Sequence, residues 1–451
     1  MNTIRTLLMV PHTSFVKNVP LFPDLGLGYL ATALTKAGYD VSIKSWNIHP
    51  SVDMFMRYIK ENAFGVIGIK VFTKDVSAAN KTIRIIRSVS PETVIVIGGP
   101  HPSASEPEQA VEDFPECDFI FRGEAEIGLP LLIGSLKEGV EIPSEDFNMI
   151  PGLVWKEDSF THSNKPILVP DIDSLGIPSW EMMRPEDYKG PKIPGVPKDG
   201  YSAPIIVTRG CPSKCMYCAA YKINGKKVRT RSPQIVLHEI ELLYHEYNVR
   251  HLFFMDTRFV HNMDVVTEIC EGLLEKNIHV AWDCVGYDAL HSFTKETLEL
   301  MKRAGCKLIN VGVESGSNDV RNRIGKQGTT EEISQKVKMI QDAGIGVRGY
   351  FMIGFPGETR KEIEETVNYA FSLPAESVQF EIVYPHPGTE LLRFMLNKYK
   401  IEKVDWESFD PYNSPFPLSA LSSSKLHRTL KKIRRRYRIL STIRRLSVLR
   451  R

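Results

Sequence analysis

The sequence lacks long hydrophobic runs, a cleavable leader and a paired set of cysteines. No stretch approaches the roughly 20 apolar residues that a membrane-spanning helix requires, and residues 1–15 contain no small-residue cleavage site. Seven cysteines among 451 residues, an odd number in a long chain, argue against a disulfide framework and for a reducing compartment. We therefore expect a cytoplasmic protein.

Acidic residues are also missing from the C-terminal tail. From Pro411 onward there are 12 Lys or Arg and no Asp or Glu, whereas the preceding residues carry the other 45 basic residues and all 54 acidic ones. The apolar residues of the tail recur at steps of three and four, which predicts an amphipathic basic helix. They are Leu426, Leu430, Ile433, Tyr437, Leu440, Ile443 and Leu446.

Three interpretations of this tail are possible. The helix lies on an anionic membrane surface, which would make the protein peripheral to a membrane and bring it to a lipid-like substrate. Alternatively, it packs on the acidic body of the same chain. Nucleic-acid binding is not expected, because no aromatic stacking platform or RNA-binding module accompanies the tail. The sequence does not decide between the first two interpretations.

The N-terminal part alternates short β-branched runs with segments of helical periodicity. The runs are residues 4–10, 40–46, 64–71, 93–99 and 118–123. Such alternation predicts right-handed βαβ units and a doubly wound, Rossmann-like parallel sheet over residues 1–140. Residues 141–200 are rich in proline, and we interpret them as a linker that contains a hairpin within 154–169.

From Tyr201 the alternation resumes. Six strand-like runs separated by helical segments predict a partial (β/α)6 barrel of the TIM type over residues 201–395, followed by a C-terminal segment, 396–451, that contains the basic helix. The whole chain is thus of the α/β class. Chemistry in such barrels lies at the carboxyl ends of the strands.

Three cysteines follow the first barrel strand directly. In TRGCPSKCMYCAA, residues 208–220, Cys211, Cys215 and Cys218 have the spacing CxxxCxxC with no fourth cysteine nearby. Thiolates select zinc, copper(I) and iron–sulfur clusters. A structural zinc ion requires four protein ligands, whereas three thiolates hold a four-iron cubane and leave one iron open. A zinc site completed by a distant histidine and three buried thiols are the alternatives.

The loop, the aromatic Tyr217 before its third cysteine and the barrel pattern resemble the radical S-adenosylmethionine (radical SAM) superfamily. The resemblance implies a 4Fe-4S cluster on Cys211, Cys215 and Cys218, with S-adenosylmethionine (SAM) chelating the open iron. It also implies reductive cleavage of SAM to a 5′-deoxyadenosyl radical, and an external electron donor such as flavodoxin or ferredoxin.

Three later stretches resemble SAM-binding segments of the same superfamily. VESG (313–316) implies that Glu314 and Ser315 hold the methionine end, and GYFMIGFPGET (349–359) implies that Gly349 and Gly354 line the adenosine. FFMDTRF (253–259) resembles a segment that usually ends in two acids. Here Asp256 is present and Thr257 replaces the second acid.

The N-terminal part resembles the cobalamin-binding domain found ahead of some radical SAM barrels. The resemblance rests on residues 20–41, on IGGPHPSASEP (97–107) and on FRGEAE (121–126). The DxHxxG motif, whose histidine binds cobalt, is absent, so we expect no histidine ligand on the lower face and His101 lining the pocket instead. A doubly wound domain retained for packing, or for another ligand, is the alternative. The expected cobalamin-contacting residues are Gly28, Gly98, Gly99, His101, Gly123 and Glu124.

These resemblances imply a cobalamin-dependent radical SAM methyltransferase that acts on an unactivated carbon of a small-molecule or lipid-like substrate. An anaerobic oxidative cyclase using the same cofactors is the alternative reaction. A non-catalytic redox sensor is the alternative from another class of protein. Candidate residues facing the substrate are Cys284, Tyr287, Tyr350, Tyr384 and His386.

Overall fold

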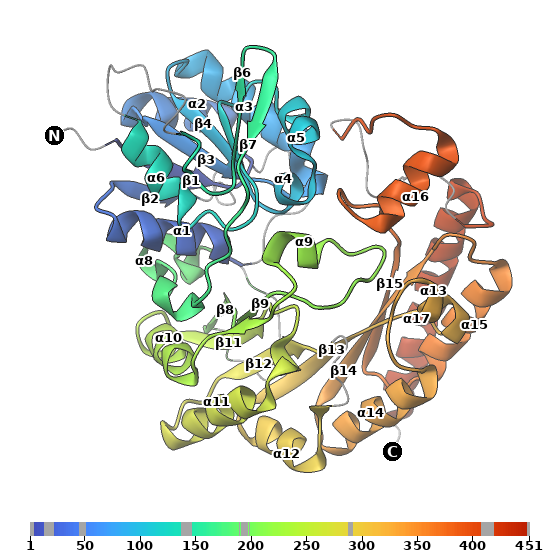
Figure 1. Ribbon diagram of the computed structural model, residues 1–451. Helices are drawn as coiled ribbons and strands as arrows, with labels where there is room; N and C mark the ends of the chain where they lie inside the picture. The colour runs from blue at the N-terminus through green and yellow to red at the C-terminus, as the bar shows by residue number, and fades with distance from the viewer. Residues whose placement is uncertain are drawn as a thin grey trace.

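The computed structural model describes residues 4–448 apart from 13–21, 45–50, 137–146, 189, 191–196, 198, 287–291 and 407–418, and describes side chains as far as residue 440. Two β-sheets, each accompanied by helices, form an N-terminal and a C-terminal domain that face one another (Figure 1). The predicted α/β class, with a doubly wound domain ahead of a partial barrel, is confirmed.

The N-terminal sheet has the strand order β2-β1-β3-β4-β5-β6-β7. Its first five strands are parallel, and their apolar side chains are buried as expected of strands covered on both faces. These strands are β1 (Thr6–Met9), β2 (Val41–Lys44), β3 (Val66–Lys70), β4 (Val94–Gly98) and β5 (Phe119–Phe121). The associated helices are α1 (Leu25–Lys36), α2 (Val52–Asn62), α3 (Val76–Val89), α4 (Pro100–Ala104), α5 (Pro107–Asp113) and α6 (Gly128–Ser135).

The hairpin expected inside the linker belongs to this sheet. Strand β6 (Leu153–Glu157) pairs antiparallel with β5, and β7 (Phe160–Ser163) pairs antiparallel with β6. The buried side chains of Val154 and Trp155 anchor β6 in the domain core. The N-terminal domain therefore extends beyond the expected boundary at residue 140, because the hairpin supplies an edge to an otherwise open sheet.

The second sheet has six parallel strands in sequential order, from β8 to β15. They are β8 (Tyr201–Ile205), β11 (Val249–Phe254), β12 (Ala281–Val285), β13 (Cys306–Glu314), β14 (Gly346–Ile353) and β15 (Ser377–Ile382). The connecting helices are α10 (Pro233–His245), α11 (Met263–Glu275), α12 (Lys295–Arg303), α13 (Asn318–Arg323), α14 (Thr330–Asp342) and α15 (Arg360–Ser372). Strands β8 and β15 are the free edges, so the barrel is open on one side.

The chain after the barrel serves both domains. Helix α16 (Glu390–Tyr399) and Trp406 pack into the core of the N-terminal domain. Helix α17 (Ser423–Val448) returns to the barrel, where Leu426, Leu430 and Ile433 join its core beside β15. The described apolar face of the tail is thus packed on the body of the protein in its first half.

Among the helices that the structure describes, none has the length and apolar character needed to cross a membrane.

Candidate active site

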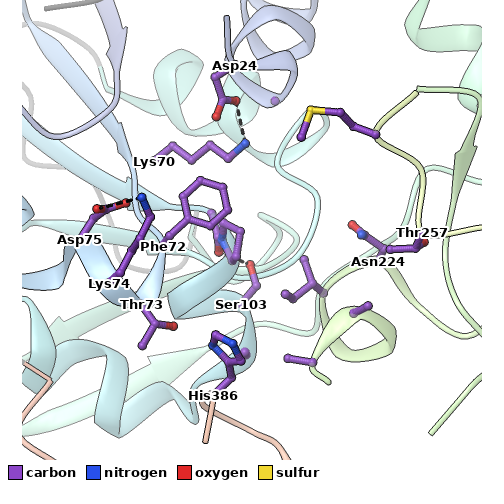
Figure 2. Close-up of a pocket in the computed structure, with 18 of the residues that line it drawn as sticks. Asp24, Lys70, Phe72, Thr73, Lys74, Asp75, Ser103, Asn224, Thr257 and His386 are labelled. Atoms are coloured by element: carbon purple, nitrogen blue, oxygen red, sulfur yellow. Dashed lines mark hydrogen bonds and ion pairs between the residues drawn. The ribbon is translucent and has the colours of Figure 1, made fainter. Parts of the chain in front are cut away.

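One cavity of about 1600 Å³ lies between the two domains. Its lining includes Gly98, the last residue of β4, and Tyr384, just after β15, so the carboxyl ends of strands from both sheets border the same space. In Figure 2, Lys70 and Ser103 from the N-terminal domain lie across this space from Thr257 of the barrel. Carboxyl ends of parallel strands are where ligands bind in both fold types.

The loop with the three cysteines enters this cavity. Strand β9 (Thr208–Arg209) pairs with β10 (Arg229–Thr230) and closes the base of the loop. Gly210 follows at a φ of +109°, and a Cβ there would collide with the carbonyl oxygen of Lys227, so the close approach of the two segments requires glycine. The cysteines that line the cavity are Cys211, Cys215 and Cys218.

The end of β11 fixes the start of this loop. Asp256 is 2% exposed, and its Oδ1 accepts hydrogen bonds from the Val207 N–H at 2.9 Å and from the N–H and the hydroxyl of Thr208. Burial raises its pKa to about 6, although these hydrogen bonds oppose the rise. Thr257 donates a hydrogen bond to the Gly210 carbonyl at 3.1 Å. Contrary to expectation, Asp256 does not border the cavity and instead positions the loop.

The donor set fits a cubane with one open corner. Among the residues that the structure describes, no three His, Cys, Asp or Glu side chains converge closely enough to hold a single metal ion. A cubane does not need that convergence, because each of its cysteine ligands binds a different iron. Three thiols facing one cavity, with both charged and apolar neighbours, are therefore suited to hold the cluster.

An ion pair lies close to the cysteines. Glu314 ends β13 at a φ of +69°, a conformation rare for residues with a side chain and often found at functional sites. Its Oε1 is 3.6 Å from the Nζ of Lys326, which is only 6% exposed, and both side chains line the cavity. Burial raises the pKa of the Cys218 thiol and the nearby Lys326 ammonium opposes that rise. The pair offers a carboxylate for an ammonium group and an ammonium for a carboxylate, as the methionine end of SAM requires.

Lys326 was not predicted from the sequence. It stands in RIGKQG, a polar stretch that looks like an ordinary loop. The sequence feature that could have drawn attention to Lys326 is the pair of nearby glycines, Gly325 and Gly328. In the structure they adopt φ values of +73° and +78° and fold the segment back toward the cysteine loop. The Met216 N–H donates to the Ile324 carbonyl at 3.1 Å, which ties the two segments together.

Three expected SAM contacts lie outside the cavity lining. Ser315 is fully buried and shares a hydrogen bond of 2.9 Å with Thr366 of α15. A Cβ on Gly349 would meet Phe351, and one on Gly354 would meet Leu426 of α17 at 2.5 Å. These residues therefore face the helices around the barrel, whereas Tyr217 does line the cavity, 5.7 Å from the ring of Phe355.

One part of the N-terminal wall is made of backbone and small side chains. Gly98, Gly99, Gly123 and Ser103 all border the cavity. A Cβ on Gly98 would meet nothing nearer than Phe121 at 3.9 Å, so open space lies beside its backbone. Ser103 accepts a hydrogen bond from the Gly123 N–H at 2.9 Å and donates one to the Gly99 carbonyl at 2.7 Å, which holds the glycine segments together. This wall fits a broad, flat ligand such as cobalamin.

Charged residues at one end of this wall are paired. Figure 2 shows Lys70 directed at Asp24, with 2.6 Å between its Nζ and the Asp24 Oδ1, and Lys74 beside Asp75. The ring of Phe72 lies next to Lys70, whose Nζ is 5.4 Å from the ring centroid.

His101 does not line the cavity. It is fully buried, with its Nε2 2.9 Å from the Asp113 carboxylate and its Nδ1 3.2 Å from the Thr73 hydroxyl. The rings of Phe114 and Trp406 meet it edge to face, both at 5.7 Å. Because both ring nitrogens are engaged inside the domain, the expectation that His101 contacts cobalamin is not supported.

Gly28 also has a packing role. A Cβ at this position of α1 would collide with the sulfur of Met183 in α8 (Trp180–Met183) and meet Pro178 at 2.8 Å. The glycine allows the linker to lie against α1, and it does not border the cavity.

Glu124 joins the two domains. Its carboxylate accepts two hydrogen bonds from Arg229, at 2.6 and 2.8 Å, and its Oε1 is 3.4 Å from Arg209, which also binds Glu126 at 2.7 Å. Burial tends to raise the pKa of Glu124, but the Arg229 hydrogen bonds and the Arg209 charge lower it overall. Glu124 borders the cavity, yet its carboxylate is engaged with the strands that flank the cysteine loop.

The candidate substrate-facing residues separate into three groups. Tyr350, Tyr384 and His386 line the cavity, and burial lowers the pKa of His386 to about 4. Cys284 is fully buried away from it. Tyr287 lies outside the described residues.

Comparisons with known proteins agree with this arrangement. Residues 205–370 match the Radical SAM superfamily, and residues 16–133 match the B12 binding domain. An uncharacterized methyltransferase of Pyrococcus horikoshii is 28% identical over 438 residues, which cover 96% of this chain and 92% of that protein. An anaerobic magnesium-protoporphyrin IX monomethyl ester cyclase of Rubrivivax gelatinosus is 25% identical over 415 residues, covering 90% of this chain and 72% of the cyclase.

A solved structure shares the two-domain fold. The radical SAM methyltransferase TsrM from Kitasatospora setae, solved with cobalamin and a 4Fe-4S cluster bound, superposes with a TM-score of 0.71 at 19% identity, over 88% of this chain and 75% of TsrM. Both domain matches coincide with the walls of the cavity, one holding the three cysteines and the other the strand-end glycines. The chain therefore carries a radical SAM domain over residues 205–370 and a B12-binding domain over residues 16–133.

Proposed function

We propose that this protein is a cobalamin-dependent radical SAM methyltransferase acting on an unactivated carbon. One observation carries the proposal: the three cysteines and the strand-end glycines of the B12-binding domain border a single cavity. Methyl transfer from cobalamin to a substrate radical requires both cofactors to reach one substrate, and a shared cavity allows this. The alternative of a non-catalytic redox sensor gives no reason for a cavity of this size between the domains.

We assign different roles to different residues around the cavity. When bound, the cluster with SAM supplies a carbon-centred radical and cobalamin supplies a methyl group. Cys211, Cys215 and Cys218 hold the cluster, while Glu314 and Lys326 orient the amino-acid end of SAM. The open space beside Gly98 admits the flat face of the corrin.

The rest of the lining protects the reacting groups. Apolar side chains such as Met352, Ile382 and Leu430 border the cavity and exclude water, which shields a reactive radical from side reactions. The carboxylate of Glu124, bonded to Arg229, keeps the cobalamin wall and the cysteine loop in a fixed relation. Fixed relative placement of reacting groups is a large source of rate enhancement.

Relatives of both reaction types match this chain. The methyltransferase of Pyrococcus horikoshii covers nearly all of the chain and supports methyl transfer. The cyclase of Rubrivivax gelatinosus supports oxidative ring formation as a second candidate. The two reactions differ in their products, because a methyltransferase adds CH2 to its substrate and releases S-adenosylhomocysteine, whereas a cyclase does neither.

The experiment is an anaerobic incubation of the reconstituted protein with SAM labelled in its methyl group, a strong reductant, cobalamin and candidate lipid, peptide and antibiotic precursors. Mass spectrometry should find 5′-deoxyadenosine, S-adenosylhomocysteine and a product that carries the label. A protein that retains iron and sulfide but binds no corrinoid when cobalamin is supplied would contradict the methyl-transfer proposal.

The partners and location are also proposals. A flavodoxin or ferredoxin supplies the electron for the cluster, and the enzyme works in the cytoplasm. Membrane contact by the tail would use the part of α17 beyond Tyr437, because the apolar residues from Leu426 to Tyr437 are packed against the barrel.

A further inference from the structure

The cavity reaches the open edge of the barrel, where helix α17 borders it. His427, Leu430, Lys431 and Arg434 of this helix all contribute to its lining, next to Ile382 of β15. This part of the cavity wall is formed by the barrel and its C-terminal helix, not by the B12-binding domain. Helix α17 therefore borders the part of the cavity that we leave to the substrate once the cofactors are placed.

Helix α17 holds a fixed position on the barrel. Leu426, Leu430 and Ile433 are buried against the barrel core, and the Tyr437 hydroxyl accepts a hydrogen bond from the Val378 N–H at 3.2 Å. The ring of Tyr437 also stacks on Phe371 at 6.1 Å. Side chains on the cavity side of this helix are thus presented from a rigid element.

The carboxylates that line the cavity all have cationic partners. The pairs are Asp24 with Lys70, Asp75 with Lys74, Glu124 with Arg229, Glu126 with Arg209, Glu314 with Lys326, and Glu381 with Arg434. Arg434 is further held by the Phe380 carbonyl at 3.0 Å. In the part of the chain that the structure describes, Lys431 lines the cavity without an ion pair to any carboxylate.

We propose that Lys431 binds the anionic group, a carboxylate or a phosphate, of the methyl acceptor. The apolar body of the acceptor then lies against Tyr350, Met352, Ile382 and Leu430, which border the same space. The inference rests on the proposed function and names its substrate class: an amphiphilic molecule with an apolar part and an anionic end. An unpaired cation beside an apolar wall recognises such a molecule by charge at one end and by burial at the other.

The test measures binding by calorimetry at low ionic strength, using the full chain with its cluster, SAM and cobalamin. Decanoate and decyl phosphate are the anionic probes, and decanol is the neutral probe with the same tail. The variant is Lys431→Met, which removes the charge but keeps the length of the side chain. The matched control is Lys432→Met, since Lys432 is an exposed neighbour on the same helix that does not border the cavity.

Lys431→Met should weaken the binding of either anionic probe by about five-fold, the effect of losing a partly exposed charge pair, while the binding of decanol stays unchanged. Lys432→Met should leave the binding of all three probes unchanged. Equal weakening by both variants would show a diffuse effect of the basic helix and overturn the proposal. No weakening by either variant would also overturn it.

A second arm separates a soluble anion from a lipid surface. Cosedimentation with phosphatidylglycerol vesicles should be equally affected by Lys431→Met and Lys432→Met, because a planar surface senses the charge of the whole helix. A loss of vesicle binding confined to Lys431→Met, together with no effect on decanoate and decyl phosphate, would overturn the proposal and assign the lysine to lipid headgroups. None of these readouts depends on turnover. Failure of the methyl-transfer proposal would instead appear as a lack of corrinoid binding or of labelled product.

Discussion

The two walls of the cavity are built by different means. On the barrel side, the groups that we propose to hold the cluster and SAM are side chains that line the cavity: three cysteines, Glu314 and Lys326. On the B12-binding side, the part that we propose to face the corrin is built of backbone and open space, with glycines at strand ends and Ser103 linking them. Binding at the barrel wall should be lost when a functional group is removed, and binding at the B12-binding wall should be lost when a bulky side chain is added.

The largest expected effect comes from the cluster ligands. Cys215→Ser should abolish cluster assembly and all turnover, because two remaining thiolates do not hold a cubane. Corrinoid binding should persist, since the opposite wall is untouched. Iron and sulfide analysis with absorption spectroscopy measures this, and Cys117→Ser in the N-terminal domain is the control that should keep its cluster. A full iron content in Cys215→Ser would contradict the assignment.

Glu124→Gln tests the contact between the walls. Removing one charge from a buried ion-pair network costs about 3 kcal/mol of unfolding free energy, to be measured by denaturant unfolding. Because the pKa of Glu124 is lowered in the folded state, its contribution is present above the unfolded pKa and is lost as the pH falls through the lowered folded value. The variant should therefore lose less stability than the parent protein over that acidic range. An unchanged acid dependence would contradict this role.

Gly98→Leu adds bulk to the open space of the B12-binding wall. The side chain should enter the cavity and weaken corrinoid binding by at least about ten-fold, the equivalent of 1.4 kcal/mol, with iron content unchanged. Gly28→Ala is the contrasting variant, because its Cβ would collide with Met183 rather than reach the cavity. It should lower the melting temperature without changing the corrinoid affinity of the folded protein. Reversal of these two outcomes would contradict the placement of the glycines.

Among the variants of the two walls, the smallest effect is expected for Lys326→Met. Losing one charged contact to the SAM carboxylate should weaken SAM binding by about ten-fold, as for a hydrogen bond between charged groups, while the cluster still assembles. Equilibrium binding of labelled SAM measures this, with Lys338→Met as an exposed control. Unchanged SAM affinity would limit Lys326 to a structural role beside Glu314.

The same difference explains what the sequence could predict. The fold could be predicted because strand and helix periodicities are regular in both domains, and the cysteine spacing pointed to a loop that does enter the cavity. Gly28 and His101 were expected at the cavity, but a sequence motif records neither direction nor burial. The structure turns Gly28 toward Met183 and binds His101 to Asp113. A sequence motif can therefore locate such residues in the chain, but it does not show whether they face the cavity or the interior of the domain.

The cavity-lining side chains of the barrel were easier to predict from the sequence, but not all of them were found. Asp256 looked like a cofactor ligand because acids at strand ends often are, yet its partners are the backbone N–H groups of residues 207 and 208. Lys326 and the cavity-facing residues of α17 were missed, because their positions depend on long-range packing. The linker hairpin was recognised, but its addition to the first sheet depends on a partner strand that is distant in the sequence.

The central claim is that the cluster and cobalamin share one cavity. Electron paramagnetic resonance of the full chain, with the cluster reduced and the cobalt as cobalt(II), tests it most directly. We expect the two signals to be broadened or split by their mutual magnetic coupling, and to revert to isolated forms when either centre is made diamagnetic. A spectrum equal to the simple sum of the two separate signals would place the centres far apart and contradict the account.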